Sequence, residues 1–256
     1  MAMFRSSYHG AKNPTLTGLD LPFLPFPNLN VQAAVHDAYY QHPAVVKDLA
    51  RWDAFLLMSS LLPQYEFTGV GKPPLTLEDW KGMRVRALGG IGKAMIKLGA
   101  VPTTVTATET YTSLSRGTVD AASFPFTYAH VAYKLTEVGE WYTANLSPGA
   151  ANCPVVVNIP AWDKLPKQYQ DILLEAKKPA YEALINAYEA ADAKNLPMME
   201  AQGLKAIVYS AEDLSAFRKV GAKPVWDVWI EEMNEKGLPG KELHELIMSK
   251  AKEANS

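Results

Sequence analysis

Two arginines, Arg84 and Arg86, are the residues best placed to do chemistry in this sequence. They alternate with apolar residues over positions 83–88, which is the period-two pattern of a β-strand, and Gly89-Gly90 then turns the chain into a predicted helix. An arginine at the carboxyl end of a parallel strand would lie beside the free N–H groups of that helix. Both groups favour a carboxylate. A structural ion pair is the alternative for either arginine, because such pairs are common in proteins.

A run of aromatic residues follows a second predicted strand. Phe124, Phe126 and Tyr128 come directly after Ser123, where that strand is expected to end. Open α/β sheets bind ligands at the carboxyl ends of their strands, so these rings could form the wall of a pocket. Packing in the hydrophobic core is the alternative role for them.

Signals for catalysis, metal binding and nucleotide binding are weak. The segment 89–93 has neither the spacing of a phosphate-binding loop nor that of a dinucleotide-binding turn. The five histidines are scattered, and Cys153 begins an apolar strand where a thiol is normally inert. Glu109 lies in the first turn of a predicted helix, where a carboxylate offsets the helix dipole. We therefore predict no catalytic residue, no metal ligand and no cofactor.

The composition narrows the possible partners. The chain has 256 residues, a formal net charge of -2 and one cysteine. Without a basic field it should not attract nucleic acid, and it cannot form an internal disulfide. Its apolar runs are shorter than the ~20 residues that cross a bilayer. Its first ten residues lack the basic start and apolar run of an export signal.

The elements that would position these residues form an α/β pattern. Residues 76–123 alternate strand, helix, strand, helix, strand, which predicts a parallel sheet covered by helices. Apolar spacing predicts helix over residues 31–57, interrupted near Pro43, and a long helix over residues 166–202 that Pro179 and Pro197 should kink. A further strand is expected at 152–159, and two more helices after Ser210.

Several spaced motifs, in order, resemble the solute-binding proteins of TRAP transporters, the DctP-like family. The resemblance covers nearly the whole chain. It rests on Leu77-Glu78-Asp79-Trp80-Lys81-Gly82-Met83-Arg84-Val85-Arg86, Leu98-Gly99-Ala100-x-Pro102, Glu109-Thr110-Tyr111-x-x-Leu114-x-x-Gly117-x-x-Asp120 and Trp162-x-x-Leu165-Pro166.

This resemblance implies a two-lobed periplasmic-binding-protein fold, type II-like, with a long kinked helix spanning the lobes. We expect residues 1–75 to form part of lobe I and residues 76–150 to form lobe II. Residues 151–190 would return to lobe I with the long helix, and residues 191–256 would form helices on lobe II and across the lobes. Family members carry about a hundred residues before the segment that Leu21-Pro22-Phe23-Leu24 resembles, so the first lobe should lack its opening strands.

The resemblance also implies a function and a site. Family members capture a small organic acid in the periplasm and pass it to the membrane permease subunits of a TRAP transporter. The family's carboxylate-binding arginine falls on Arg86 and its second-lobe contact on Phe124, where a ring replaces a possible polar contact. A further basic residue that some members have is not evident around residues 65–67. The predicted ligand-binding residues are Arg86, Phe124, Ser123, Gly89, Tyr128 and Asn145. The alternatives are an enzyme that uses Glu109 or a histidine, or a ligand sensor on the same fold.

Overall fold

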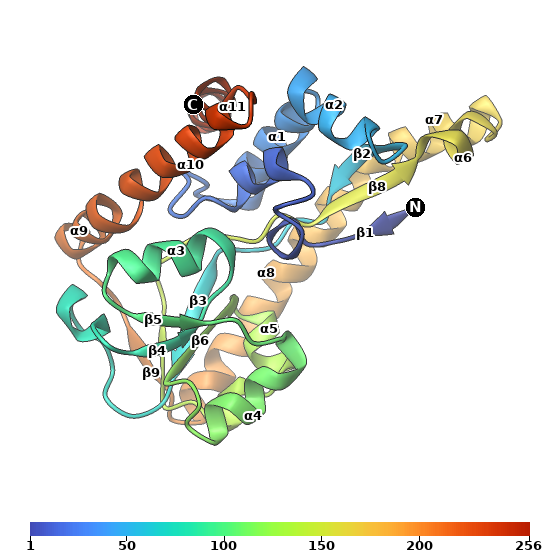
Figure 1. The fold of residues 1–256 in the computed structure, drawn as a ribbon. Helices are drawn as coiled ribbons and strands as arrows, with labels where there is room; N and C mark the ends of the chain where they lie inside the picture. The colour runs from blue at the N-terminus through green and yellow to red at the C-terminus, as the bar shows by residue number, and fades with distance from the viewer.

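Two β-sheets of different size organise the chain, which a computed structural model describes over residues 1–256 (Figure 1). The smaller sheet has three strands in the order β1-β8-β2 and is antiparallel throughout. We call the part of the molecule around it lobe I. Its strands are β1 (Ala2–Met3), β8 (Pro154–Asn158) and β2 (Ala54–Ser59).

The larger sheet has six strands in the order β5-β4-β6-β3-β7-β9, and the part around it is lobe II. Strand β4 runs parallel to β5 and β6, whereas β3 is antiparallel to β6 and β7. The strands are β3 (Tyr65–Gly69), β4 (Arg84–Arg86), β5 (Val101–Thr103), β6 (Ala121–Pro125), β7 (Trp141–Thr143) and β9 (Lys205–Ile207).

The predicted strand–helix alternation in lobe II is confirmed. Helix α3 (Gly89–Lys97) connects β4 to β5, and α4 (Thr110–Ser115) connects β5 to β6. A capping box between Thr76 and Asp79 starts the region, and Gly82 adopts the left-handed conformation expected where the first turn ends. Strand β6 continues to Pro125, two residues beyond the predicted end at Ser123.

The other helices lie mainly in lobe I and along the boundary between the lobes (Figure 1). The remaining α-helices are α1 (Leu29–Tyr40), α2 (Pro43–Ala50), α5 (Tyr128–Ala132), α6 (Ile159–Asp163), α7 (Lys167–Glu175), α8 (Lys177–Ala201), α9 (Ala211–Gly221), α10 (Lys223–Glu235) and α11 (Gly240–Ala254). Short 3-10 turns are η1 (Ser6–Tyr8), η2 (Pro14–Asp20), η3 (Leu77–Trp80), η4 (Ala107–Glu109) and η5 (Leu135–Glu137).

The prediction of helix over residues 31–57 is correct to Ala50 and wrong beyond it. Asp53 adopts a positive φ of 49°, which ends the helical turn, and Ala54–Ser59 then forms β2 against β8. A short apolar run such as 54–58 fits a buried strand as well as a helix, so spacing alone did not separate the two.

The long helix predicted for residues 166–202 divides into α7 and α8 at Ala176. Pro179 has no N–H to donate to the carbonyl three to four residues earlier, which accounts for the break there. Pro197 lies inside α8. Helix α8 contacts both lobes: the Tyr181 hydroxyl accepts from Ser59 N (2.9 Å) in lobe I, and Asp192 accepts from Thr127 N (3.0 Å) in lobe II.

The chain crosses between the lobes earlier than the predicted boundary at residue 75. Strand β3 already belongs to the larger sheet, so the first crossing is the segment 60–64. The return crossing lies between β7 and β8, at residues 144–153. After α8, helix α9 packs on α3 of lobe II, whereas α10 and α11 pack together and α11 lies on α1 of lobe I.

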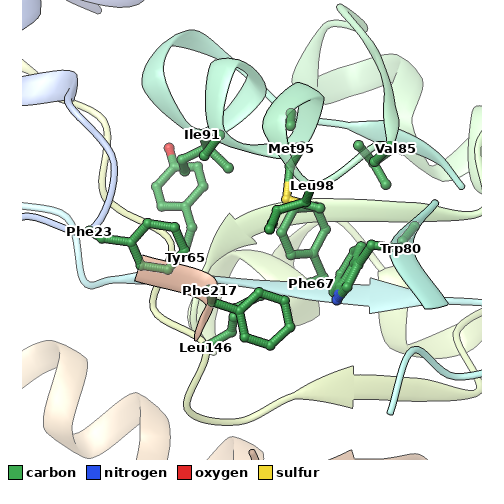
Figure 2. Close-up of a cluster of buried hydrophobic side chains, with 14 of the residues drawn as sticks. Phe23, Tyr65, Phe67, Trp80, Val85, Ile91, Met95, Leu98, Leu146 and Phe217 are labelled. Carbon is green, nitrogen blue, oxygen red and sulfur yellow. The ribbon is translucent and has the colours of Figure 1, made fainter. Parts of the chain in front are cut away.

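Each lobe has its own hydrophobic core. In lobe II, Phe67 and Trp80 pack with ring centroids 4.9 Å apart beneath Met95 of α3 and Leu98, which directly follows α3 (Figure 2). A second cluster joins α1, α10 and α11 in lobe I through residues such as Trp229. Phe23 packs into the first cluster and Trp226 contacts both clusters, so the two cores are separate except at the boundary between the lobes.

Burial of Asp20 in lobe I gives a prediction about stability and pH. Burial raises the pKa of Asp20 from 3.8 to about 7, although hydrogen bonds from Asn152 N and Ser6 Oγ lower it. The folded state therefore binds this proton more tightly than the unfolded chain. The contribution of Asp20 to the free energy of unfolding is greatest below about pH 4 and falls as the pH rises through about 7.

We predict that Asp20→Asn removes this dependence. The melting temperature of the variant minus that of the wild type should increase between about pH 5 and about pH 8, measured by thermal unfolding. Asp163→Asn, at an exposed carboxylate that forms no ion pair, is the matched control, and its melting-temperature difference from the wild type should not change with pH. A flat difference for Asp20→Asn as well would refute the assignment.

Candidate functional site

Arg86 is the last residue of β4 and is held rigidly by its neighbours. Strands β5 and β6 flank it on both sides. Its Nε donates to Val105 O (3.2 Å) and its Nη1 donates to Ser123 O (2.7 Å). The residue is only 2% exposed. These contacts fix the guanidinium at the carboxyl edge of the parallel strands, as the sequence predicted.

The structure separates the two arginines that the strand pattern alone left equivalent. Arg84 forms an ion pair with Asp120 at the protein surface. Arg86 forms no ion pair, and its Nη2 donates no hydrogen bond within the chain. The alternative of a structural ion pair therefore applies to Arg84 and not to Arg86.

The surroundings of Arg86 make its charge available to an anion. Burial lowers the pKa of the guanidinium, and the positive charge of Arg5 lowers it further, while Tyr65 and Tyr8 act in the opposite direction. The guanidinium carbon lies 4.2 Å from the centroid of the buried Phe124 ring, a cation–π contact. A buried cation without a counter-charge is costly. A bound carboxylate would supply that charge and accept from Nη2.

Arg5 is a second cation in this region that sequence reasoning missed. Its Nη1 donates to the hydroxyl of Tyr65 (3.0 Å), and it forms no ion pair. The sequence has no basic residue at positions 65–67, but the fold brings Arg5 of lobe I to Tyr65. The two residues are 60 positions apart and no local pattern marks Arg5, so only the tertiary fold reveals the pair.

Three of the other predicted residues lie around Arg86 or at the lobe boundary. Ser123 is fully buried, and its Oγ donates to Arg86 O (3.1 Å), so it positions the arginine. Tyr128 is half-buried, and its ring lies 5.1 Å from that of Tyr188 on α8. Gly89 has a φ of 51°, and a Cβ there would lie 3.1 Å from the Cβ of Ser7 in lobe I. The start of α3 thus lies directly against the other lobe.

Asn145 has a different environment. Its Nδ2 donates to Tyr209 O (2.9 Å), and its Oδ1 accepts from Tyr209 N (2.8 Å). Both ends of the amide are therefore used to fix the return crossing to the segment after β9. No hydrogen bond links Asn145 to Arg86 or Ser123.

The side chains considered for catalysis are in environments that suit structural roles. Burial lowers the pKa of His36 to about 3 and that of His130 to about 4, which keeps both imidazoles neutral. Glu109 is exposed and accepts from Thr106 Oγ1 (2.7 Å) at the start of its helix. No group of three or more His, Cys, Asp and Glu side chains is arranged to hold a metal ion.

Comparison with known proteins connects this geometry to one family. The family described as "Bacterial extracellular solute-binding protein, family 7" (DctP) matches residues 1–233. A monocarboxylate 2-oxoacid-binding periplasmic protein from a Nostoc species is 32% identical over 147 residues, which is 57% of this chain and 40% of that protein. The matched region thus spans less than half of the relative's length.

Solved structures share the fold at lower identity. A TRAP solute-binding protein from Rhodoferax ferrireducens, in complex with copurified benzoate, aligns with a TM-score of 0.86 at 20% identity, covering 99% of this chain and 79% of that one. A marine metagenome TRAP solute-binding protein specific for aromatic acid ligands, in complex with metahydroxyphenylacetate, aligns with a TM-score of 0.85 at 18% identity. That alignment covers 99% of this chain and 80% of the other.

The environment of Cys153 predicts an unreactive thiol. Burial raises its pKa to about 11, so about 0.1% of it would be thiolate at about pH 8. We expect a thiol-reactive disulfide reagent to label the native protein at least about 100-fold more slowly than the protein unfolded in guanidinium. Labelling is followed by absorbance. Rapid stoichiometric labelling of the native protein would show that Cys153 is accessible as a nucleophile.

Proposed function

This chain belongs to family 7 of the bacterial extracellular solute-binding proteins, the DctP family, and from that membership we propose that it captures a small organic acid in the periplasm and delivers it to a TRAP-type membrane transporter. The observation that carries the proposal is the buried guanidinium of Arg86, which has no carboxylate partner in the chain. A ligand carboxylate would balance the positive charge of the guanidinium and accept the hydrogen bond that its Nη2 can still donate. None of the helices combines the length and apolarity needed to cross a membrane.

Within this proposal the ligand is a monocarboxylate with an apolar or aromatic body. Phe124 places an aromatic ring, not a polar group, under the guanidinium. The Nostoc relative is named for monocarboxylate 2-oxoacids, and two structural neighbours hold aromatic acids. Arg5 and the Tyr65 hydroxyl would supply further donors for a polar substituent next to the carboxylate.

Capture in this account requires lobe movement and no covalent chemistry. Two crossing segments, α8 and the junction between α9 and α10 connect the lobes, so the lobes can rotate about these connections and enclose the ligand. Closure removes water from the ion pair, which strengthens the attraction between the carboxylate and Arg86. The permease subunits would then recognise the closed form.

An enzyme or a sensor on the same fold is the rival function. The family and the structural neighbours are solute-binding proteins, and His36, His130 and Cys153 are buried in environments that suppress acid–base and nucleophilic chemistry. Incubation with any acid that stabilises the protein provides the test. Chemical conversion of that acid would contradict passive binding.

Substitution of Arg86 tests the proposed ligand contact. We expect Arg86→Ala to weaken binding of benzoate, used as the probe, by at least about 100-fold, because the ion pair and its hydrogen bonds are lost together. Arg86→Lys should keep only a weak remnant, because an ammonium cannot reproduce the bidentate fork. Affinity is measured by calorimetry and by the ligand-dependent rise in melting temperature.

Arg84→Ala is the matched control, since Arg84 lies two residues away and is already paired with Asp120. It should change benzoate affinity less than about two-fold. If a stabilising acid binds Arg86→Ala and the wild type equally well, Arg86 is not the ligand arginine.

A further inference from the structure

Two guanidinium groups without a carboxylate partner lie at the boundary between the lobes, one from each lobe. Arg86 ends β4 in lobe II, and Arg5 lies between β1 and η1 in lobe I. The hydrogen bonds of both side chains go to carbonyl or hydroxyl oxygens, and neither forms an ion pair within the chain. Like charges on facing surfaces repel, so this pair influences how closely the two lobes approach each other.

Arg5 is fixed to lobe I through both of its neighbours in the chain. Phe4 N donates to Pro154 O (3.3 Å) at the start of β8, and Ser6 N donates to Asn152 O (3.2 Å) just before that strand. Ser6 is also fully buried. The backbone of Arg5 is therefore held on both sides, and the position of its charge follows the position of lobe I.

The strand order of the larger sheet brings Arg5 to the edge where Arg86 lies. Arg5 Nη1 donates to the hydroxyl of Tyr65 (3.0 Å), and Tyr65 is the first residue of β3. Strand β6 lies between β3 and β4, and it pairs Pro125 with Tyr65 and Ala122 with Arg86. Because β3 is antiparallel to β6 and β4 is parallel to it, the start of β3 and the end of β4 share one edge of the sheet.

The segments that follow the two arginines are also in contact. Ser7 comes shortly after Arg5 and Gly89 shortly after Arg86, and a Cβ on Gly89 would lie 3.1 Å from the Cβ of Ser7. The electrostatics agree with this proximity. Burial lowers the pKa of Arg86, and the positive charge of Arg5 lowers it further. The contacts and the charges therefore both place the two cations within range of each other.

The groups around Arg5 offset little of its charge. Burial raises the pKa of Tyr65 above its usual value, so its hydroxyl accepts a hydrogen bond from Arg5 without carrying a negative charge. Asp20 is an acidic residue near Arg5, but its oxygens accept from Ser6 Oγ and Asn152 N. Burial raises the pKa of Asp20 to about 7, so at about pH 6 this carboxyl group is mostly protonated and neutral.

We propose that Arg5 makes closure of the lobes depend on the charge of the ligand; this inference rests on the proposed function, in which Arg86 binds the acid. In the free protein the guanidiniums of Arg5 and Arg86 repel each other and disfavour the closed arrangement. A carboxylate bound between them lies closer to each cation than the cations lie to each other, so the attraction exceeds the remaining repulsion. An acid therefore draws the lobes together, whereas a neutral molecule of the same shape does not.

The distance between the lobes in the free protein tests the repulsion directly. Nitroxide labels on Lys47→Cys in α2 and on Arg116→Cys after α4 report this distance by double electron–electron resonance (Figure 1). Both labelled positions are exposed, and Cys153 is buried. At about pH 6 and low salt, we expect Arg5→Met to increase the population with shorter distances at least about three-fold over the labelled wild type.

Control variants separate the charge of Arg5 from its hydrogen bond. Lys12→Met removes an exposed cation of lobe I and should leave the distances unchanged. Arg5→Lys keeps the charge, and Tyr65→Phe removes only the hydrogen bond, so neither should shift the distances toward shorter values. In an Arg86→Ala background, Arg5→Met should have no further effect, because its repelling partner is absent. Unchanged distances in Arg5→Met, or an equal shift in Lys12→Met, overturn the proposal. Thermal unfolding verifies that each variant is folded.

Ligand binding tests the attraction. Benzoate should shift the labelled wild type toward shorter distances, and benzamide, its uncharged isostere, should not. Measured by calorimetry, Arg5→Met should weaken benzoate binding at least about five-fold and Lys12→Met less than about two-fold. An equal shift with benzamide, or full benzoate affinity in Arg5→Met, contradicts the proposal. The measurement on the free protein needs no ligand, so its failure is distinguishable from a failure of benzoate to bind at Arg86, which would contradict the proposed function.

Discussion

A buried guanidinium without a counter-charge is the constraint on which the site depends. Arg86 is 2% exposed, and the protein gives it two backbone carbonyls and the face of Phe124 but no carboxylate. Carbonyl oxygens and a ring offset only part of the cost of removing a full charge from water. In the proposed function, the remaining Nη2 donor and the remaining charge of Arg86 are the groups that attract the ligand carboxylate.

The fold supplies this arrangement through its connections. Parallel strands β4, β5 and β6 place the ends of three segments at one edge, so Arg86, Val105 and Ser123 meet there although the sequence separates them. Lobe I reaches the same edge through Arg5, which donates to Tyr65, and through Ser7, which lies close to Gly89. Helix α8 forms hydrogen bonds with both lobes, and Glu66 accepts a hydrogen bond from Ser147 N of the return crossing, so these contacts set the relative position of the lobes.

Local signals predicted the local structure well and failed where distant segments decide. The capping box at Thr76 and the glycines that end each helix defined the alternation in lobe II, because capping is a property of a few adjacent residues. The choice between helix and strand for residues 54–59 depends on pairing with β8, a hundred residues away. Likewise, nothing local shows that Asp120 pairs with Arg84, that Arg5 reaches Tyr65, or that Tyr209 occupies the amide of Asn145.

A crystal structure of the chain with bound benzoate measures the central interaction directly. The account predicts that the two carboxylate oxygens lie about 2.7–2.9 Å from the Nη atoms of Arg86, with the ring packed near Phe124. Benzoate bound away from Arg86, or a carboxylate held by other groups while Nη2 of Arg86 stays without a ligand contact, would contradict it.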